Sequence, residues 1–590
     1  MQPTLPPTAQ PTALEAPTAL EAQSALKPVV IFAVLAVVLA LRLIHLAGAP
    51  QSPLSYQPGP DENYYLRFGQ AVASGTGADA PEFTFMDPGY GYLLGAIFKI
   101  TGANVFVVYL LQTLLDTATA YGVLTIGRLL GRPRAGLYGA LLYAVTATAI
   151  MFSATLLKET SVAAWLTWWV VAALGVFQSE RRRTWLAFGV LCGVGIALRS
   201  TLSVLALLGI VLPKIAGRSW AGGAAQAGML VAGLALALAP WSVRNYQANG
   251  GLSPLPHNGG IVLHQAYNID NPRSAIWIPA FVNYSDPGEI WRGYAAEATA
   301  RTGHALSPPE VDQYWRGEAF VFLREHPAAV LADIVRKGLM FLADTEVPNN
   351  RSSVEERMFS PLLKLLPPPA LWLVSMGVAG LIWLALQDRR WIILAAPIAL
   401  SWATMALFWA EDRFRFHSMP VLALCSGIFI DEAVRHVGRY RQWRLRRPLA
   451  LGALGGLAIL LAATSLYLGG RFPPPTVRWD HVVWGYIKMG RLADARTLAD
   501  RIALEQPDNG PIIEARGYLA VAAKDYGAAV ASYSRAVELR PRAYLAHYNL
   551  AKALLMTGDK SNAVREARVA LSLSPSAETK ALLAQIEAAP

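Results

Sequence analysis

The sequence predicts an all-α protein in which a polytopic membrane helix bundle is followed by a soluble α-solenoid of short repeats. Three observations predict this fold class. Of the 590 residues, 54% are hydrophobic and only 15% are charged, whereas soluble domains carry about a quarter of charged residues. Long apolar runs recur up to residue 470, and the remaining sequence repeats with a fixed period. The 17 Trp and 22 Tyr suit a chain with many membrane–water boundaries.

The first segment has a composition that cannot form a core. Residues 1–27 are rich in Pro, Ala and Thr and include "PTALEAPTALEA", so we expect a disordered N-terminal tail. The apolar run that follows is long enough to cross a bilayer. It lacks a basic n-region and an evident small-residue cleavage site, which favours a membrane anchor over a removed signal.

Apolar runs predict about eleven transmembrane helices, which with their loops form a membrane domain over residues 28–470. The runs lie at 29–47, 105–126, 135–152, 160–177, 185–198, 200–213, 224–241, 367–386, 391–409, 419–433 and 449–468. The two runs between 185 and 213 are short for full crossings. Two weaker runs, 89–101 and 327–343, contain charged residues, and we expect them to be interfacial helices.

The basic loops predict the topology. If the runs alternate across the membrane, "GRLLGRPR", "SERRRT", "KIAGRS", "QDRR" and "RHVGRYRQWRLRRP" all fall on one side, which the positive-inside rule identifies as the cytoplasm. Much of the net charge of +11 is then explained by basic residues in cytoplasmic loops. We therefore expect no nucleic-acid partner. We expect an integral protein of a bacterial-type inner (plasma) membrane, with a cytoplasmic N-terminus and outer loops at 48–104 and 242–366.

The predicted outer side collects acidic and basic side chains. Asp61 and Glu62 lie in the first outer loop, in "PGPDENYYLRFG", and Glu159 ends the turn "SATLLKE". Arg199, the segment "PWSVRNYQANG" and the loop "AEDRFRFHS" reach the same side. An acidic pair in a loop is often only a helix cap or a solvated turn. Its convergence with several arginines fits a site for a lipid-linked anionic substrate.

The C-terminal part repeats every 34 residues. Three alanines and three prolines recur with this spacing: Ala495, Ala529 and Ala563, and Pro507, Pro541 and Pro575. Small residues at helix crossings, with Pro closing the second helix, resemble tetratricopeptide repeats. We therefore expect a repeat domain over residues 476–590, on the outer side. Such grooves usually bind a protein, here a protein or glycan acceptor, and a purely structural cap is the alternative.

The order of the membrane motifs resembles the GT-C glycosyltransferases. An acidic pair in the first outer loop, many spans and a long outer loop opening "PWSVRNY" are most similar to the protein-mannosyltransferase and aminoarabinose-transferase-like branch. The likeness extends over about residues 29–440. It implies a GT-C-like membrane bundle whose donor is a polyprenyl-phosphate sugar. It also implies inverting transfer of the sugar to an acceptor hydroxyl on the outer face.

The resemblance implies roles for the acidic residues. An attacking hydroxyl must lose its proton, and a carboxylate within hydrogen-bond reach can accept it. Asp61 matches the family's general base, Glu62 fits an orienting or helper role, and the two roles could be exchanged. Glu159 could complete the acceptor site, bind a metal or only pair with Lys158. Three further residues are expected near the acceptor or in its loop, namely Tyr64, Tyr65 and Asn245.

The leaving group is a lipid phosphate, which departs as an anion and needs positive donors. Arginine suits it because its guanidinium presents a fixed fork of N–H groups. Arg244 and Arg199 are the first candidates for donor phosphate binding, followed by Arg413 and Arg415. Each has a simpler alternative, since an arginine at a helix end commonly extends to lipid headgroups.

Cofactor requirements stay open at this point. No cofactor is certain, although carboxylates near a lipid phosphate could recruit Mg²⁺ or Mn²⁺, and the metal site is unknown. Asp116 lies within an apolar run, where a structural bond to a neighbouring helix is favoured over catalysis.

Two other function classes compete with the enzyme. The first is a membrane-anchored repeat scaffold for envelope glycan or protein assembly. In that case the repeats are the working part and the membrane domain has no catalytic activity. A lipid-linked sugar transporter would explain spans and charges, but the charges gather in outer loops rather than at a midplane site. Neither the sugar nor the acceptor can be deduced from the sequence.

Overall fold

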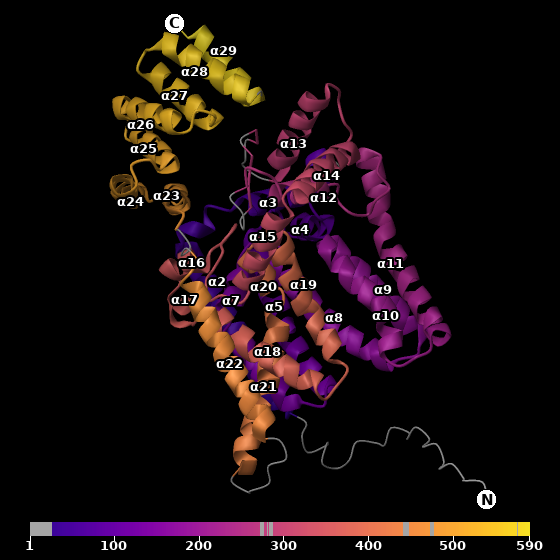
Figure 1. Ribbon diagram of the computed structural model, residues 1–590. Helices are drawn as coiled ribbons and strands as arrows, with labels where there is room; N and C mark the ends of the chain where they lie inside the picture. Colours follow the sequence, from indigo (N-terminus) through magenta and orange to yellow (C-terminus); the bar gives the residue numbers. More distant parts are fainter. Residues whose placement is uncertain are drawn as a thin grey trace, which may run out of the picture.

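The computed structural model describes residues 26–78, 80–271, 276–279, 281–282, 287–440, 448–472, 477–574 and 576–589. Within these residues every regular element is a helix, so the predicted all-α fold class is confirmed. Figure 1 shows a bundle of long helices from which the C-terminal helices project at one end. The predicted disordered tail falls almost wholly outside the described residues, as does Pro575.

Helices form at each of the apolar runs. They are α2 (Pro28–Gly48), α5 (Val105–Leu129), α6 (Pro133–Ala144), α7 (Ala147–Ser153), α8 (Glu159–Gln178), α9 (Arg182–Leu198), α10 (Ser203–Ile215), α11 (Trp220–Asn249), α18 (Pro369–Ala385), α19 (Trp391–Leu407), α21 (Met419–Tyr440) and α22 (Pro448–Gly469). Among the described residues, five helices are long and apolar enough to cross a membrane, or six if one bent pair counts as a span. The chain is an integral membrane protein, and the number of eleven spans stays a prediction.

The run at 135–152, expected to form one straight span, instead forms α6 and α7, which are bent by 64°. The break has a polar partner inside the bundle. Arg42 of α2 donates to the carbonyl oxygens of Tyr143 and Ala144 at 3.2 and 2.5 Å, so the backbone groups freed by the bend are satisfied. Arg42 also pairs with Asp116 at 2.7 Å, which gives Asp116 the predicted bond to a neighbouring helix.

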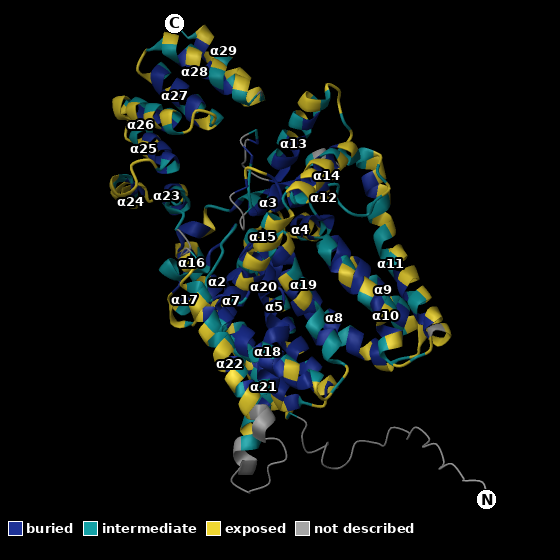
Figure 2. Ribbon diagram, viewed as in Figure 1, coloured by how far each residue is buried: buried dark blue, intermediate teal, exposed yellow. Residues whose placement is uncertain are grey.

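Small residues bring the central helices together. A Cβ on Gly380 of α18 would lie 1.9 Å from the carbonyl oxygen of Cys425 in α21. A Cβ on Gly427 of α21 would lie 2.1 Å from the carbonyl oxygen of Ala135 in α6. Glycine lets backbones approach this closely, which matters in lipid because burial of apolar surface contributes little to helix association there. Figure 2 shows the result, with α18 and α21 largely buried and α11 and α22 exposed to the surroundings.

Four of the predicted cytoplasmic loops meet at one end of the bundle, which we call the basic end; residues 441–447 of the fifth loop lie outside the described residues. Arg390 donates to the carbonyl oxygen of Leu129 at 2.9 Å, and Arg132 donates to Gln387 at 2.7 Å. Arg218 donates to the carbonyl oxygen of Ser179 at 3.0 Å. Loops that are far apart in sequence are therefore on one side, as the alternation of basic loops predicts.

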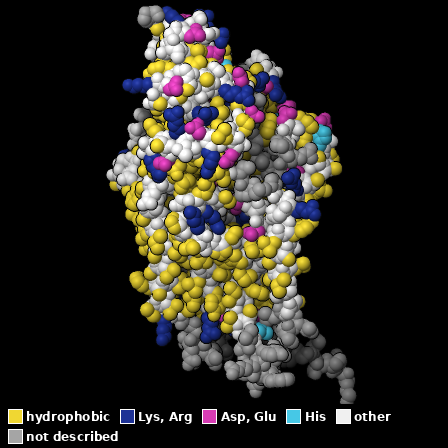
Figure 3. Space-filling model, turned by 90° about the vertical axis from the view of Figure 1, so that its left-hand side faces the viewer, with side chains coloured by type: hydrophobic (Ala, Val, Ile, Leu, Met, Phe, Trp, Pro, Cys, Tyr) yellow, Lys and Arg dark blue, Asp and Glu magenta, His cyan; other side chains and the backbone are white. Residues whose placement is uncertain are grey.

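Shorter helices cover the opposite end, which we call the repeat end. They are η1 (Ala49–Gln51), η2 (Pro53–Ser55), α3 (Pro60–Ser74), η3 (Pro81–Thr84), α4 (Pro88–Thr101), η4 (Ser200–Leu202), α12 (Gly259–Ala266), α13 (Pro287–Thr302), α14 (Pro308–Glu325), α15 (Pro327–Met340), α16 (Ser353–Phe359), α17 (Pro361–Leu365) and α20 (Asp412–Phe416). On the face in Figure 3, hydrophobic side chains cover the lower half and charged side chains gather above them. This distribution fits a membrane-embedded bundle with a polar layer at one end.

The C-terminal helices stack as antiparallel pairs. They are α23 (Trp479–Lys488), α24 (Leu492–Glu505), α25 (Gly510–Ala522), α26 (Tyr526–Leu539), α27 (Tyr544–Met556), α28 (Lys560–Leu573) and α29 (Ala577–Ala588). The repeating alanines Ala495, Ala529 and Ala563 are fully buried. A Cβ on Gly517 would lie 2.7 Å from the ring of Tyr533. The small residues of the period therefore do lie where helices cross.

The first repeat helix is built into the membrane domain. A Cβ on Gly485 of α23 would lie 2.1 Å from the carbonyl oxygen of Pro53 in η2. Just before α23, Arg478 donates to both carboxylate oxygens of Glu355, at 3.1 and 2.8 Å. It also donates to the carbonyl oxygens of Asn349 and Asn350 at 2.8 and 3.2 Å. The repeats are thus attached to residues 349–355, which we call the 349–355 segment.

Candidate functional site

The acidic pair begins helix α3. Gly59 is the N-cap, Pro60 occupies the first turn, and Glu62 accepts a hydrogen bond from the Gly59 amide at 2.7 Å. Proline and an acidic residue are favoured in a first turn, because its amides lack partners and its dipole attracts negative charge. The same sequence that caps the helix therefore fixes the direction of Asp61 and Glu62.

Glu62 is fully buried and its carboxylate is held by the fold. Arg351 donates to both of its oxygens at 2.9 Å, and the amide of Leu156 donates at 3.2 Å. A bidentate pair of this kind is strong and directional. Glu62 thus joins α3 to the 349–355 segment, and its oxygens are already occupied.

Asp61 is partnered on one side. Its Oδ2 accepts from Nη1 of Arg413 at 2.6 Å, and its amide donates to the side chain of Asn350 at 2.9 Å. Only 6% of Asp61 is exposed. The guanidinium of Arg413 also binds Glu411 at 2.6 Å, so Asp61 is positioned by α20 and by the 349–355 segment.

Glu159, in the first turn of α8, is the least satisfied acidic group of the site. It is 1% exposed, and within the described residues neither of its oxygens has a hydrogen-bond partner. Arg199 and Arg413 lie 3.9 Å away, each through Nη1. A buried carboxylate without hydrogen bonds is costly, so this arrangement marks a place suited to function. Of the three alternatives for Glu159, the pairing with Lys158 is not observed within the described residues, because Lys158 pairs with Asp87.

A cavity of about 540 Å³ opens beside these groups, and we call it the Arg199 cavity. Its polar wall consists of Asp87, Lys158, Arg199, Ser200, Thr201, Asn258, Arg316, Thr404 and Arg413. Its apolar wall includes Met86, Val262, Leu263, Phe320, Phe408, Trp409 and Phe414. Four cationic side chains face one carboxylate in this lining, so the cavity is suited to an anion attached to an apolar chain.

Arg199 is prepared for an anionic ligand. It packs over the ring of Phe414 at 4.7 Å, and its Nη1 makes no hydrogen bond within the described residues. Burial lowers the pKa of Arg199 below its usual value, against the opposing effect of Glu159. A buried guanidinium with unused donors gains most from a bound phosphate.

Asp87 is a residue that the sequence analysis did not select. It accepts from Lys158 at 2.7 Å and from the amide and hydroxyl of Ser200 at 3.0 and 2.6 Å. It thereby fixes the cationic wall by joining α4, α8 and η4. Asp87 directly precedes the Pro88 that starts an apolar run, and this N-cap position was the available signal.

Tyr65 lies against the same charges. It is 1% exposed, and its hydroxyl has no hydrogen-bond partner within the described residues. Burial raises the pKa of Tyr65 well above its usual value, and the charges of Asp87, Asp61 and Glu159 act in the same direction. Tyr65 therefore keeps its proton and remains a hydrogen-bond donor. Tyr64, by contrast, donates to the carbonyl oxygen of Glu82 at 3.0 Å.

The structure places Arg244 and Asn245 apart from the Arg199 cavity lining. Arg244 donates to the carbonyl oxygens of Ala78 and Phe83 at 2.9 and 3.1 Å. Asn245 donates to the carbonyl oxygen of Ser253 at 2.8 Å. These contacts fasten two loops to the end of α11, so both residues organise the surroundings of the site.

Arg415 is also held by backbone groups. It donates to the carbonyl oxygens of Ala343 and Thr345 at 2.7 and 3.0 Å and pairs with Asp412 at 2.7 Å. Its side chain is almost fully buried. Arg413 and Arg415 belong to the same short motif, RFR, but their side chains have different partners. Of the two, only Arg413 lines the Arg199 cavity.

The carboxylates fit a divalent metal poorly. Among the described residues there is no group of three or more His, Cys, Asp or Glu placed to hold one. Between Asp61 and Glu159 lies the guanidinium of Arg413, at 2.6 and 3.9 Å. A cation of the protein itself thus occupies the position where Mg²⁺ would need oxygen ligands.

Comparison with known proteins finds two family matches. Residues 80–243 match the family model of dolichyl-phosphate-mannose-protein mannosyltransferase, and residues 517–558 match the tetratricopeptide repeat. The resemblance to a GT-C glycosyltransferase with C-terminal tetratricopeptide repeats is confirmed. The first match includes Asp87, Lys158 and Arg199. Two of the four cationic side chains that line the cavity, Lys158 and Arg199, thus come from the matched segment.

Solved structures give a more distant likeness. The apo oligosaccharyltransferase of Archaeoglobus fulgidus is 14% identical, with a TM-score of 0.40, and the match covers 76% of this chain and 57% of that chain. The same enzyme with an inhibitory peptide and a dolichol-phosphate gives the same identity, TM-score and coverage. The chain therefore matches little more than half the length of that protein. No curated protein sequence matches the chain.

Proposed function

We propose that the chain is a membrane glycosyltransferase that moves a sugar from a polyprenyl-phosphate donor to an acceptor hydroxyl. The observation that carries the proposal is the Arg199 cavity, where Lys158, Arg199 and Arg413 meet an apolar wall. Asp61, bonded to Arg413 at 2.6 Å, lies directly behind that wall. The family matched by residues 80–243 is named for a dolichyl-phosphate-linked donor, which supports the same substrate class.

The two parts of the donor correspond to the two parts of the cavity. The phosphate would lie against Arg199 and Arg413, whose N–H groups suit phosphate oxygens. The polyprenyl chain would follow the apolar side chains of Phe320, Phe408 and Trp409. Lys158, the N-cap residue of α8, adds positive charge but is paired with Asp87.

The transfer step exchanges one bond to the anomeric carbon for another. The acceptor oxygen forms a bond to this carbon while the bond to the phosphate oxygen breaks, and its electron pair leaves on the lipid phosphate. The hydroxyl proton passes to the carboxylate of Asp61, which acts as the general base. Attack opposite the leaving phosphate inverts the anomeric configuration. The sugar, a hexose or a pentose, is left open by the lining.

Other residues of the site support this step. Glu159 lies beside the developing oxocarbenium character, and its negative charge would stabilise that transition state. The hydroxyl of Tyr65, which has no hydrogen-bond partner among the residues that the structure describes, would orient the acceptor or the sugar. Glu62 acts as a positioning residue, because its oxygens are held by Arg351. Arg244, Asn245 and Arg415 keep the surrounding loops in place.

We also propose that the leaving phosphate is stabilised by arginine rather than by a divalent cation. Arg413 already lies between Asp61 and Glu159, and Arg199 adds a second guanidinium. Transfer should therefore persist in excess EDTA. A loss of activity that Mg²⁺ or Mn²⁺ restores would contradict this part of the proposal.

The orientation follows from the basic end. Its arginines belong on the cytoplasmic side by the positive-inside rule, so the site and the repeats would face the outside. We place the protein in a bacterial-type inner membrane with its N-terminus in the cytoplasm.

Arg199→Gln tests the proposal. Wild-type membranes should consume one of several polyprenyl-phosphate sugars, and the variant should raise the donor KM about tenfold or more, because a charge-assisted hydrogen bond contributes about 1.5–3 kcal/mol. Arg324→Gln is the matched control, since Arg324 is exposed on α14 and does not line the cavity. Equal donor KM values for Arg199→Gln and wild type would contradict the donor site. If wild type consumes no donor, the scaffold function is favoured instead.

A further inference from the structure

The apolar and polar faces of helix α15 are reversed relative to those of a helix on a soluble protein. Its exposed side carries Leu331, Val335 and Leu339 at the spacing of one helical face, the first two 63% and 54% exposed. Its buried side carries an ion pair between Lys337 and Asp333, 2.8 Å apart. In water this arrangement would expose apolar surface while burying charge, so it indicates that the exposed side of α15 faces lipid.

Aromatic residues of two bundle helices mark the level at which α15 lies. Trp402 of α19 is 45% exposed, and its indole nitrogen donates to the carbonyl oxygen of Gly338 in α15 at 3.2 Å. Tyr467 is exposed near the end of α22. The segment after α15 is bonded to the same helix, because the amide of Asp344 donates to the carbonyl oxygen of Ser465 at 3.1 Å. Exposed Trp and Tyr near the ends of membrane helices collect at membrane–water boundaries, so α15 lies at such a boundary.

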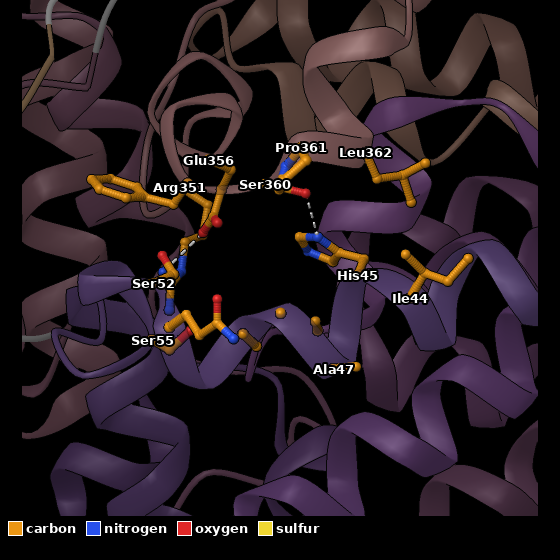
Figure 4. Close-up of a pocket in the computed structure, with 15 residues that line it drawn as sticks. Ile44, His45, Ala47, Ser52, Ser55, Arg351, Glu356, Ser360, Pro361 and Leu362 are labelled. Atoms are coloured by element: carbon orange, nitrogen blue, oxygen red, sulfur yellow. Dashed lines mark hydrogen bonds and ion pairs between the residues drawn. The ribbon is translucent and has the colours of Figure 1, made fainter.

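The end of α2 shows the same change from apolar to polar surroundings. In Figure 4, Ile44 and Leu362 lie on one side of a pocket of about 320 Å³, and Ser52, Arg351 and Glu356 lie on the other side. Ile44 belongs to a helix long and apolar enough to cross a membrane, and it is itself exposed. This division fits a boundary between lipid and water at the repeat end, where Figure 1 also shows α15.

A bilayer fits the exposed side of α15 better than a second protein does. Helix α15 packs against α19 and α22, both of which are apolar helices of the membrane domain. Lipid that covers these two helices would reach the stripe of α15 as well. Arg336, at the edge of the stripe, is exposed, and an arginine in this position extends to lipid phosphates while its aliphatic part stays in the apolar layer.

The buried side of α15 holds the end of α19. The Nζ of Lys337 donates to the carbonyl oxygen of Phe408 at 2.6 Å and lies 4.9 Å from the ring centre of Tyr267. The hydroxyl of Tyr267 donates to the carbonyl oxygen of Leu407. The last carbonyl groups of a helix have no partner within the helix, so these donors fix its end. Phe408 and Trp409 line the Arg199 cavity, and α15 therefore supports its apolar wall.

We propose that the exposed stripe of α15 lies in the lipid bilayer at the repeat end, and that this contact keeps the apolar wall of the Arg199 cavity in its donor-binding position. The second half rests on the proposed function, because it concerns regulation of the same site. Lipid that accepts Leu331 and Val335 holds α15 at a fixed depth, and Lys337 transmits this position to Phe408. Loss of the lipid contact would loosen the end of α19 and weaken donor binding.

Spin labelling measures the depth of α15 without any sugar transfer. A nitroxide is attached to Val335→Cys in the purified full-length protein in nanodiscs, where the native Cys192 and Cys425 are buried. We expect the label to collide more often with oxygen, which concentrates in lipid, than with a water-soluble nickel complex. Glu318→Cys, exposed on α14, is the matched control and should show the opposite order.

Val335→Glu tests the connection between α15 and the cavity. A carboxylate on the stripe is costly in lipid, so α15 should move away from the bilayer. We expect faster hydrogen exchange of the amides of residues 404–409 and a donor KM raised about tenfold, which corresponds to about 1.4 kcal/mol. Leu504→Glu makes a similar change at an exposed apolar residue of the repeats and should leave both quantities as in wild type.

The outcomes of these measurements are distinct. Nickel collisions as frequent at Val335→Cys as at Glu318→Cys would overturn the inference. Rare collisions with both reagents at Val335→Cys would show that a protein or a second copy of the chain covers the stripe, and would overturn it as well. Unchanged exchange or an unchanged donor KM in Val335→Glu would overturn the connection to the cavity. A wild type that shows the lipid contact and the exchange effect but consumes no donor would contradict the proposed function and leave the membrane contact supported.

Discussion

The acidic residues of the site differ in how completely they are partnered. Glu62 accepts hydrogen bonds at both oxygens, Asp61 binds one arginine, and within the described residues Glu159 accepts none. Reactive groups need an unused lone pair or a partner that can be exchanged, whereas structural groups are saturated. This order agrees with the proposed function, in which Glu62 is a positioning residue and Asp61 and Glu159 take part in the chemistry.

Glu62→Gln should destabilise the protein. Loss of the carboxylate leaves Arg351 buried with too little negative charge, and breaking a buried ion pair from one side costs about 3–5 kcal/mol. Thermal unfolding of the purified variant should show a clear drop in Tm. Glu318→Gln is the matched control, because Glu318 is about half exposed on α14. A variant as stable as wild type would show that the pair does not hold α3.

The individual site residues could be predicted from the sequence only in part. Asp61, Glu159, Arg199 and Arg413 were all expected on one face, and the structure brings them together. Arg351 was not found, because its partner Glu62 lies 289 positions away in the sequence and no local pattern encodes such a pair.

At the scale of elements, the 349–355 segment links the repeats to the acidic pair. Asn350 accepts from the amide of Asp61, Arg351 binds Glu62, and Arg478 binds the backbone of Asn350. The first repeat is thereby connected to the site through a short series of hydrogen bonds. This connection explains why a repeat array fused to the membrane domain is packed so closely against it.

Arg478→Ala should loosen this segment. Removal of the bidentate contact with Glu355 should increase hydrogen exchange of the 349–356 amides and lower kcat, with little change in the donor KM. Arg478→Lys should recover part of the effect, since lysine keeps the charge but not the fork. Arg496→Ala is the control, because Arg496 is exposed and its nearest carboxylate is 3.9 Å away. Unchanged exchange in Arg478→Ala would contradict the connection.

Glu346, which precedes the 349–355 segment, should make the stability of the protein depend on pH. Burial raises the pKa of Glu346 to about 7 from its usual 4.5, and the charge of Asp412 acts in the same direction. The folded protein therefore holds a proton that the unfolded chain has lost, so stability falls as pH rises from about 4.5 to about 7. In Glu346→Gln this part of the decline should vanish when Tm is measured across that range. A variant whose Tm declines as steeply as wild type would show that another group titrates.

The elements themselves were more predictable than their shapes. Hydrophobic runs identified the bundle helices because length and apolarity are local properties. The bend between α6 and α7 was missed, since it depends on Arg42 from another helix reaching the free carbonyl groups. The repeat period correctly predicted that Ala495, Ala529 and Ala563 lie where helices cross. It did not predict the close contact between Gly485 of α23 and Pro53 of η2.

For the whole molecule, the two ends of the bundle imply opposite sides of a membrane. The basic loops meet at one end and the site lies with the repeats at the other. Hydrophobic side chains cover the surface between them on the face in Figure 3. This arrangement predicts on which side of the membrane each loop lies.

Labelling with a membrane-impermeant maleimide tests the topology. Asp508→Cys, at a side chain that is 77% exposed in the repeats, should react in intact cells. Arg183→Cys, at an exposed position in the first turn of α9 at the basic end, should react only after permeabilisation. Wild type serves as the control because Cys192 and Cys425 are both buried. The reverse labelling pattern would place the site in the cytoplasm and contradict the orientation.

The most direct test of the central claim is sugar transfer by Asp61→Asn compared with wild type at equal expression. Asparagine can still accept the hydrogen bond from Arg413, so the fold and donor binding should be retained while the base is lost. The account predicts transfer slower by about a hundredfold or more, the range expected for removal of a general base. Equal rates of transfer by the two proteins would show that Asp61 is not the base and would contradict the account.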